Sequence, residues 1–574
     1  MPASSGVILG SFSLLFSAAI VGGLGARAIK LPLVIGYIVA GIVLGNLFPQ
    51  FIDRSLISIV ADIGIILLLF TLGIEFSFQR FRKVLGLIGW AAVVQILLTF
   101  LAGHLFFLAI GFPFFAAFFI GLAGAFSSTA VVVKLLAENA QLETTHGEII
   151  TAWLIVQDLA VIPIMLLLPA ISTAHPGETT VSAILFVVGR NLLKAGLILI
   201  LVLSLGRRFM PWVATQVGKL KNREIFVVTT VAVVFLAGSV SYALGLSPAI
   251  GAFLSGLLMA ETSQNHAIFS EVRPLRDIFA VMFFVALGFV VPFSTIFRFG
   301  GLLVVGTVGL LLVKSFLVFG LGKFLGFHRK TAVLAAIALL PMSEFGFILA
   351  QEGNRLGVLN IEHYLFLVAL TFLTILVGSP MLGKSHHVYV RVSNILKHFP
   401  KLFEDREAPD AATQELPFSH HVVLCGYGRV GKYIGRALAM ASVPFVVIDY
   451  NSATVSTLKE RGIPVVFGDP GDIDVLDYAQ VDKARVLIIA IPDRHTQELI
   501  IAHAQTLNKG IHIICRTHYE EDQKVLKALG VDVIIQPEFE AAISIVSRLL
   551  SNYGVTTDDI NGKITRLKIE HGLG

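Results

Sequence analysis

Long apolar runs separated by short polar loops fill the first two thirds of this sequence. A helix needs about 20 apolar residues to cross the hydrocarbon core of a bilayer. Exposing many such runs to water would be strongly unfavourable, so we expect an α-helical polytopic membrane domain with about 13 spans. The ninth run is short and begins at Pro248. The runs cover residues 6–26, 31–49, 57–76, 84–110, 113–137, 147–170, 181–205, 224–244, 247–260, 277–296, 299–323, 331–353 and 362–382.

The composition agrees with a protein that is mostly surrounded by lipid. Charged residues make up 14% of the chain, compared with roughly 25% in soluble domains. The net charge is only +5, and the basic residues lie in short loops instead of forming a patch with interleaved aromatic residues. We therefore expect no nucleic-acid partner. The first run lacks the basic flank and the cleavage site of a secretory signal, so we expect it to remain as a span.

The distribution of basic residues predicts the orientation of the spans. Loops after even-numbered runs carry little beyond Arg54, Arg298 and Arg355, whereas loops after odd-numbered runs carry most of the lysines and arginines found in residues 1–384. By the positive-inside rule, the N-terminus faces outward and the C-terminus faces the cytoplasm. The expected location is the inner (plasma) membrane of a bacterium.

An ungapped internal similarity joins positions whose numbers differ by a constant 215. It pairs the second run with the ninth, the third with the tenth and the fifth with the twelfth. The copies lie seven spans apart, and an odd number of spans reverses orientation, which predicts the inverted repeat of secondary transporters. The alternative is chance, because apolar runs align easily and glycine recurs in helix packing. The matches are Ile35-Gly36 with Ile250-Gly251, Gly41 with Gly256, Asp62-Ile63 with Asp277-Ile278, Leu72-Gly73 with Leu287-Gly288, and Ser128 with Ser343.

The chain changes character after Gly383. We predict a membrane domain over 1–384, a polar linker over 385–419, a Rossmann-like α/β domain over 420–551 and a C-terminal tail over 552–574. Six short apolar strands separated by helical stretches predict a parallel, doubly wound sheet. The only cysteines, Cys425 and Cys515, lie in this part, which excludes a disulfide framework or a cysteine metal site and suits the cytosol. The strands are expected at 421–425, 445–448, 464–467, 485–490, 511–515 and 531–535.

A polar pair, Gln157-Asp158, lies near the centre of the sixth run. An ionisable group at that depth costs several kcal/mol unless it faces a cavity or a partner. A carboxylate can hold either a proton or a monovalent cation, and mutual exclusion at one site couples their movements. We predict that the transported cation binds near Asp158. The alternative is a structural Asp bonded to a neighbouring helix.

Further polar residues occur at similar depth in three other runs. Small residues, prolines and hydroxyls in the fifth and twelfth runs predict two interrupted helices whose freed carbonyls and half-helix dipoles point at the ion. The serines could instead only pack helices, and the lysine could be a structural counter-ion. The candidates are Ser127, Ser128 and Thr129 in the fifth run, Lys314 in the eleventh, and Ser343 and Glu344 in the twelfth.

A glycine motif predicts a nucleotide site in the C-terminal domain. Gly426-Tyr427-Gly428-Arg429-Val430-Gly431 follows the first strand and opens a helix, and Asp449 ends the second strand. Backbone N–H groups would bind phosphate and Asp449 would accept ribose hydroxyls, favouring AMP, ADP, ATP or NAD(H) over NADP(H) as a regulatory ligand with no redox role. Asp469 and Arg516, each after a strand, could reach the nucleotide or be ordinary loop residues.

The whole chain resembles the Kef-type potassium:proton antiporters of the monovalent cation:proton antiporter-2 family, whose members carry an RCK-type nucleotide-binding domain. The matching features are Gln157-Asp158, Ser127-Ser128-Thr129, Glu344-Phe345, Lys314 and the glycine motif. The resemblance implies a homodimer with thirteen spans and a core domain that moves against a scaffold. The loop after the ninth run, 266–274, keeps only one acid of the glutathione-gated members, Glu271, which argues against gating by glutathione.

These features predict a secondary antiporter for potassium and protons, not an enzyme. Nucleotide is the expected regulator, and a cytosolic ancillary protein is a further candidate partner. The expected route of regulation is the cytoplasmic loops, including Glu271 and Arg273. The rival hypotheses are a nucleotide-gated cation channel and a sodium:proton antiporter. A membrane-anchored nicotinamide-dependent oxidoreductase is disfavoured, because too few residues follow the sixth strand to form a substrate domain.

Overall fold

The computed structural model describes residues 5–29, 31–75, 86–139, 141–142, 144–172, 222–243, 247–260, 264–396, 420–517 and 520–570, with single positions at 262 and between 204 and 216. The predicted seventh span, 181–205, lies almost wholly outside the described residues. The chain divides into two compact units. The membrane unit contains residues 1–132, 151–318 and 336–382, and the C-terminal unit contains 133–150, 319–335 and 383–574.

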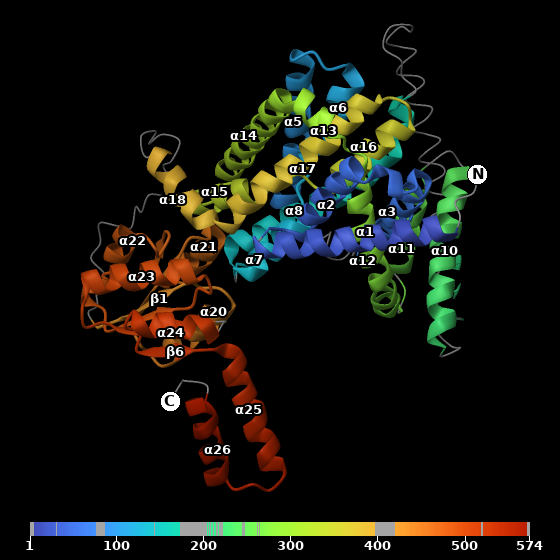
Figure 1. Ribbon diagram of the computed structural model, residues 1–574. Coiled ribbons are helices and arrows are strands. Elements are labelled where there is room, and N and C mark those ends of the chain that lie inside the picture. The colour runs from blue at the N-terminus through green and yellow to red at the C-terminus, as the bar shows by residue number, and fades with distance from the viewer. Residues whose placement is uncertain are drawn as a thin grey trace. The chain divides into compact units, whose positions relative to one another are not determined.

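Helices build the whole described part of the membrane unit (Figure 1). Seven described helices are long and apolar enough to cross a membrane, and three shorter apolar helices accompany them. The predicted count of thirteen spans stays a prediction. The helices that lie in or enter this unit are α1 (Ser5–Ala28), α2 (Leu33–Leu47), α3 (Arg54–Glu75), α5 (Leu87–Ala109), α6 (Phe114–Ala125), α7 (Thr129–Glu138), α8 (Thr145–Ser172), α10 (Arg223–Ala243), α11 (Pro248–Ala260), α12 (Asn265–Phe289), α13 (Phe293–Arg298), α14 (Gly300–Phe324), α15 (Arg329–Ala338), α16 (Phe345–Arg355) and α17 (Ile361–Gly383).

The helices repeat at the offset found in the sequence. Helix α2 begins at Leu33 and α11 at Pro248, while α6 begins at Phe114 and α15 at Arg329, so both pairs of starts differ by 215. The pairs α1 and α10, α3 and α12, α5 and α14, α7 and α16, and α8 and α17 correspond within a few residues at most boundaries. The internal similarity is therefore a repeat of seven helical elements, not a chance alignment of apolar residues.

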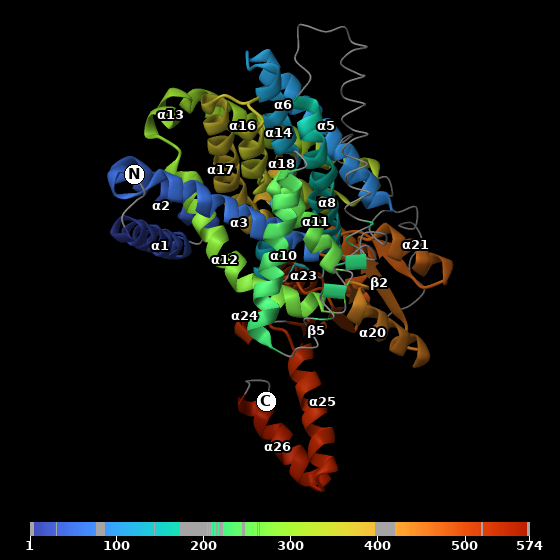
Figure 2. The same ribbon diagram turned by 90° about the vertical axis from the view of Figure 1, so that its right-hand side faces the viewer.

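Glycines allow repeat-related helices to pack with their backbones in contact. A side chain on Gly41 of α2 would collide with the carbonyl oxygen of Val285 on α12. In the other copy, a side chain on Gly256 of α11 would collide with the carbonyl oxygen of Phe70 on α3. Helix α2 packs on α12 and α11 packs on α3, with α1 beside α2 and α10 beside α11 (Figures 1 and 2). Small residues at these crossings let the helices approach closely without lipid between them.

The C-terminal unit contains a six-stranded parallel sheet in the order β3-β2-β1-β4-β5-β6. All six predicted strands are present, and this order is that of a doubly wound dinucleotide-binding fold. Alternate residues of β1 enter different cores: Val423 and Cys425 pack with α22 to α24, and Val422 and Leu424 pack with α20 and α21. The strands are β1 (Val422–Cys425), β2 (Phe445–Asp449), β3 (Val465–Phe467), β4 (Val486–Ile489), β5 (His512–Arg516) and β6 (Val533–Ile535).

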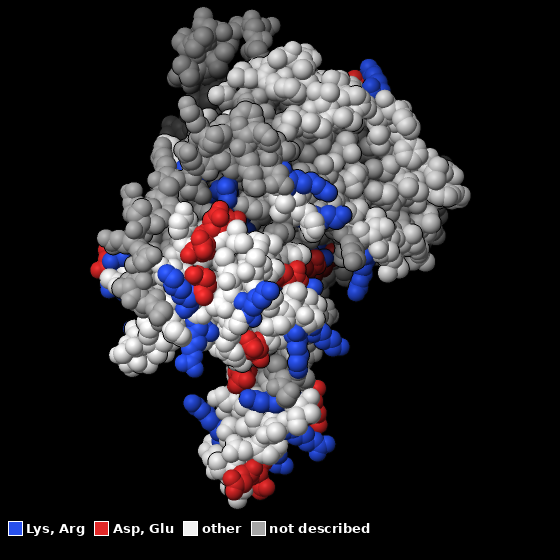
Figure 3. All heavy atoms as spheres, turned by 90° about the vertical axis from the view of Figure 1, so that its left-hand side faces the viewer, with Lys and Arg blue, Asp and Glu red and all other residues white. Residues whose placement is uncertain are grey.

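Helices cover both faces of the sheet and extend beyond it (Figure 1). Charged side chains gather over this unit, as Figure 3 shows. The predicted linker begins with a helix, α18 (Ser385–Leu396), because Ser385 and Tyr389, one turn apart, are both buried; residues 397–419 lie outside the described part. The remaining helices are α20 (Arg429–Met440), α21 (Ser452–Glu460), α22 (Ile473–Tyr478), α23 (Arg494–Leu507), α24 (Glu520–Ala528), α25 (Pro537–Asn552) and α26 (Thr557–Glu570).

Candidate functional sites

Two interrupted helices cross in the membrane unit. Extended backbone separates α6 from α7 between Ala125 and Thr129, and a second break separates α15 from α16. The two breaks pair as antiparallel backbone through a bridge between Ser127 and Met342. These are the fifth and twelfth runs, so the structure bears out the prediction that both are broken.

The pairing at the crossing has two-fold symmetry. The Ser128 N–H donates to the carbonyl of Pro341, and the Ser343 N–H donates to the carbonyl of Phe126, both at 3.2 Å. Ser128 and Ser343 differ by 215 in residue number, and so do Phe126 and Pro341. The repeat therefore relates each bond to the other. Ser127 and Met342 are related in the same way. A two-fold axis therefore passes through the crossing, as two inverted copies of one structural unit require.

The crossing brings together four helix ends of opposite polarity. The carbonyl ends of α6 and α15 and the N–H ends of α7 and α16 converge there, which gives partial negative and partial positive charge in one place. The Lys314 Nζ, which is buried, donates to the carbonyl of Phe126 at 2.7 Å. Glu344 lies at the N-cap position of α16, beside the N–H end. Each charged side chain thus faces the helix-end charge opposite to its own.

Gln157 connects α8 to the crossing. Its Oε1 accepts from the Ser127 N–H at 2.8 Å, and its Nε2 donates to Gln95 Oε1 at 2.5 Å. Gln95 on α5 in turn donates to the carbonyl of Ala125 at 3.0 Å. Asp158 is the next residue of α8, and its side chain is half-buried. Sequence reasoning missed Gln95, although a lone amide in the apolar fourth run was an available signal.

The hydroxyl groups at the crossing fall into two classes. Ser128 donates to Glu344 Oε2 at 3.0 Å, Ser343 accepts from the Phe345 N–H at 3.3 Å, and Ser127 donates to the carbonyl of Leu339 at 2.9 Å. These three serines are used within the protein. The buried Oγ1 of Thr129 has no hydrogen-bond partner among the described residues. Thr129 begins α7 and is the repeat mate of Glu344. Its hydroxyl is therefore a second type of oxygen beside the broken helices, one that the described residues do not use in a hydrogen bond.

The glycine motif forms one wall of a pocket at the carboxyl ends of β1 and β4. Gly426 has φ +91°, which other residues rarely adopt, and Gly428 is the N-cap of α20. Arg429 and Val430 also line this pocket, whereas Gly431 permits close packing, because a side chain there would collide with the carbonyl of Gly426. In this strand order β1 and β4 flank the topological switch point, where such folds bind ligands.

Asp449 holds the glycine loop in place. Its two carboxylate oxygens accept from the N–H groups of Tyr427 at 2.7 Å and Asn451 at 2.8 Å. Burial raises the pKa of Asp449 above its ordinary value, while these backbone N–H groups act in the opposite direction. The carboxylate also lines the pocket, and each oxygen retains a lone pair that can accept from a ligand hydroxyl.

The other two residues predicted to reach the nucleotide are Arg516 and Asp469, and only one of them lines the pocket. Arg516 lines the pocket. Asp469, expected to reach the nucleotide, does not belong to the pocket lining; it is 3% exposed and its Oδ2 lies 2.8 Å from Lys330 Nζ. The reason is that residues 319–335 belong to the same compact unit as the sheet. Sequence reasoning also missed Thr144, Thr145 and Glu148, which line the pocket although they lie far upstream of the glycine motif in the sequence.

Comparisons with known proteins agree with both the helical membrane part and the C-terminal α/β domain. Residues 15–384 match the family described as sodium/hydrogen exchanger, transmembrane, and residues 422–537 match the TrkA-N domain. A putative cation/proton antiporter, YbaL of Escherichia coli (strain K12), is 29% identical over 539 residues, which cover 92% of this chain and 94% of YbaL.

A second relative is the glutathione-regulated potassium-efflux system protein KefC of Klebsiella pneumoniae subsp. pneumoniae. It is 29% identical over 538 residues, covering 94% of this chain and 83% of KefC. Among solved structures, the TrkA-N domain of ybaL from Escherichia coli is 31% identical, covers 23% of this chain and 99% of that domain, and has a TM-score of 0.23. The resemblance to Kef-type proteins is confirmed, and the curated relatives are transporters, not enzymes. Because the exchanger match spans more than half of the sequence, this chain belongs to the sodium/hydrogen exchanger family and carries a TrkA-N domain at its C-terminal end.

Proposed function

We propose that this chain is a secondary active cation:proton antiporter whose physiological exchange is potassium efflux against proton entry. The observation that carries the proposal is the crossing of two broken helices, with Gln157 bonded to its backbone and Asp158 the next residue of the same helix. The partnerless oxygen of Thr129 among the described residues supports a cation site there, because a partly dehydrated cation needs oxygen ligands. Potassium is chosen because relatives such as KefC are named as potassium-efflux proteins.

The proposed assembly is a homodimer in a bacterial inner membrane with the TrkA-N domain in the cytosol. The exposed apolar side chains of α25 and α26, including Ile545, Leu549 and Ile569, support contact with a second copy. Glu271, the one remaining acid of the 266–274 segment, pairs with Arg223 at 2.8 Å. We therefore do not propose glutathione as a regulatory ligand. The cytosolic ancillary regulator stays a prediction.

Reconstituted transport tests the proposed function. Proteoliposomes containing the purified chain should show proton flux that depends on an imposed potassium gradient, with lower flux when sodium replaces potassium. Equal or higher flux with sodium would favour a sodium:proton antiporter instead. Large cation currents without proton movement would favour a nucleotide-gated channel and overturn the antiport proposal.

We expect the exchange to be electroneutral. Gln157 cannot ionise and is used in hydrogen bonds to Ser127 and Gln95, so one carboxylate, Asp158, exchanges one proton for one cation. Steady-state flux in proteoliposomes should therefore be unchanged when a membrane potential is imposed with an ionophore for an ion that is not transported. Flux that increases steeply with voltage would show that a second charge moves.

The TrkA-N domain is proposed to bind an adenine nucleotide as a regulator. Replacing Asp449 with Ala should weaken that binding about 10-fold to 150-fold, because a hydrogen bond to a charged group is worth about 1.5–3 kcal/mol and the glycine loop loses its anchor at Tyr427. Calorimetric titration of the full chain with AMP, ATP and NADH measures this effect.

The transport pathway should survive the Asp449→Ala change, because that residue belongs to the C-terminal unit. Nucleotide-independent potassium-coupled proton flux is the control. Loss of that flux in a well-folded variant would assign the TrkA-N domain to transport itself rather than to regulation.

A further inference from the structure

The turn between α7 and α8 is built into the C-terminal unit. Gln141 Nε2 donates to Asp493 Oδ1 at 3.3 Å, and the Thr144 hydroxyl donates to the Gln141 carbonyl at 2.6 Å. His146 lies 3.5 Å from the Tyr450 hydroxyl and within hydrogen-bond distance of Thr144. Gln141, Thr144 and His146 are all buried. The turn is therefore held by the ends of β2 and β4, not by the edge of the sheet.

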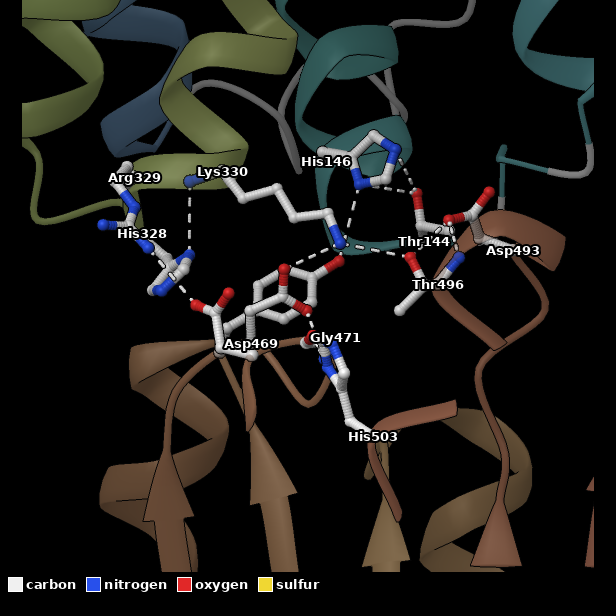
Figure 4. A network of polar contacts seen from close by, with 12 residues as sticks. Thr144, His146, His328, Arg329, Lys330, Asp469, Gly471, Asp493, Thr496 and His503 are labelled. Atoms are coloured by element: carbon white, nitrogen blue, oxygen red, sulfur yellow. Dashed lines mark hydrogen bonds and ion pairs between the residues drawn. The ribbon is translucent and has the colours of Figure 1, made fainter. Parts of the chain in front are cut away.

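A second segment reaches the same place. Lys330, at the start of α15, pairs with Asp469 at 2.8 Å and donates to the Thr496 hydroxyl at 3.1 Å. Thr496 also bonds to Asp493, the residue that holds the α7–α8 turn. Figure 4 shows Lys330, His146, Asp469 and Thr496 meeting between the helices and the strand ends. The cytoplasmic ends of two elements that build the ion crossing are thus fixed in one buried polar network.

The same turn also lines the candidate nucleotide pocket. Thr144, Thr145 and Glu148 lie on its wall together with the glycine motif and Asn451. Glu148 is exposed and Thr145 is half-buried, so both can meet a ligand. Arg429, Lys432 and Arg516 contribute basic groups to the lining. The pocket accordingly combines donors from the TrkA-N fold with the carboxylate of Glu148 and the hydroxyl of Thr145 from the first turn of α8, and with Thr144 just before that helix.

We infer that the nucleotide site is composite: a nucleotide held by the glycine motif is also contacted by Thr145 and Glu148 of α8. This inference rests on the proposed regulatory function and adds the residues through which it acts. Helix α8 runs unbroken from Thr145 through Asp158, with no Gly or Pro between Glu148 and Asp158. Ten residues of helix span about 15 Å, so one continuous helix connects the ligand contact to the proposed ion site.

The consequence is a direct coupling between ligand and transport. If α8 tilts during exchange about its end in the buried network, Glu148 and Thr145 change their orientation toward the glycine motif, and the pocket has different affinity in the two conformations. A ligand shifts an equilibrium only through such a difference. By linkage, any residue that changes this contact changes nucleotide affinity and the nucleotide effect on transport together. Glu271 and Arg273 lie on α12 in the membrane unit, and the expected route through them stays a separate prediction.

The charge of Glu148 predicts whether its replacement raises or lowers the affinity for nucleotide. A carboxylate on the wall repels the phosphates of a nucleotide, so Glu148→Gln should tighten binding. Water screens like charges near a protein surface, so their repulsion is moderate and a gain in affinity of about threefold to tenfold is expected. The gain should be larger for ATP than for AMP, because ATP carries more phosphate charge. Thr145→Val should weaken binding, because it removes a hydroxyl and keeps the side-chain shape.

The experiment titrates AMP and ATP into the full chain and its variants, and measures potassium-coupled proton flux at the same nucleotide concentrations. Glu138→Gln is the matched control: Glu138 lies exposed on α7, faces Lys134 at 3.8 Å and does not line the pocket. Glu148→Gln should shift the affinity and the nucleotide concentration for half-maximal effect on flux by the same factor. Glu138→Gln should shift neither.

The outcomes separate this inference from the proposed function. If Asp449→Ala loses nucleotide binding while Glu148→Gln and Thr145→Val bind AMP and ATP as the wild type does, the composite site is overturned and the regulatory proposal stands. A shift in affinity that leaves the half-maximal concentration for flux unchanged overturns the coupling. If the wild type binds none of AMP, ATP and NADH at millimolar concentration, the proposed nucleotide function itself fails.

Discussion

Asp158→Asn is expected to reduce potassium-coupled proton flux to the level of protein-free vesicles. The amide neither releases a proton near neutral pH nor offers a full negative charge to a cation, so both halves of the exchange are lost. Asn has nearly the same shape as Asp, and the bonds of the adjacent Gln157 to Ser127 and Gln95 do not involve the carboxylate. The variant should therefore remain folded, with an unchanged melting temperature.

The control for this experiment removes a carboxylate elsewhere in the membrane unit. Asp277 lies exposed on α12, next to Arg276, and Asp277→Asn should retain flux. Both variants are compared in proteoliposomes at equal protein content, with a cytoplasmic-side pH dye as the readout. Flux near the wild-type level in Asp158→Asn would remove Asp158 from the mechanism and leave Glu344 and Lys314 as the ionisable side chains at the crossing.

Lys330→Met is expected to lower the free energy of unfolding of the C-terminal unit by about 3–5 kcal/mol, because removing one partner of a buried pair leaves an uncompensated charge. Both side chains are 4% exposed. Burial alone would raise the pKa of Asp469, but the Lys330 ammonium and the Gly471 N–H hold that pKa below its ordinary value. A carboxylate with a lowered pKa stabilises the fold above about pH 4 and loses that contribution only as the pH falls further.

The double variant Lys330→Met with Asp469→Asn should recover most of the lost stability, because no isolated charge remains. Lys134→Met is the control. Its ammonium pairs with Glu138 at the surface, where both side chains are 57% exposed, and such pairs contribute about 0–1 kcal/mol. Thermal or urea unfolding followed at pH 7 measures all three. If the double variant were no more stable than Lys330→Met, the ion pair would not be the reason for the loss.

Local pattern was enough to predict the elements on which both candidate sites are built. The six strands are short apolar runs with turn residues between them, and the glycine motif fixes the loop after β1 because Gly426 needs a positive φ. Pro341 and the serines predicted the broken helices, because they interrupt otherwise continuous apolar runs. The constant offset identified the repeat because both copies keep glycine at the same close contacts, such as Gly41 and Gly256.

Long-range partners could not be predicted in this way. Asp469 looks like a nucleotide ligand from its place after β3, but its partner Lys330 lies far upstream in the sequence and belongs to α15. Likewise, nothing local to Glu148 indicates that it lines the pocket of a distant glycine motif. The start of the predicted linker folds as α18 because Ser385 and Tyr389 are buried. Their burial depends on residues of the folded unit outside this segment, so the local sequence could not predict it.

The two-fold axis at the crossing has a thermodynamic consequence. Two inverted copies can exchange their conformations, and the state open to one side of the membrane then becomes the state open to the other. If the copies were identical, the two states would have equal free energy, and the gradients alone would set the direction of exchange. The C-terminal unit removes this equality. It contains residues 133–150 and 319–335, whereas their repeat mates, 348–365 and 104–120, belong to the membrane unit. In the proposed mechanism, the cytosolic domain therefore favours one of the two states, and a bound nucleotide changes how strongly it does so.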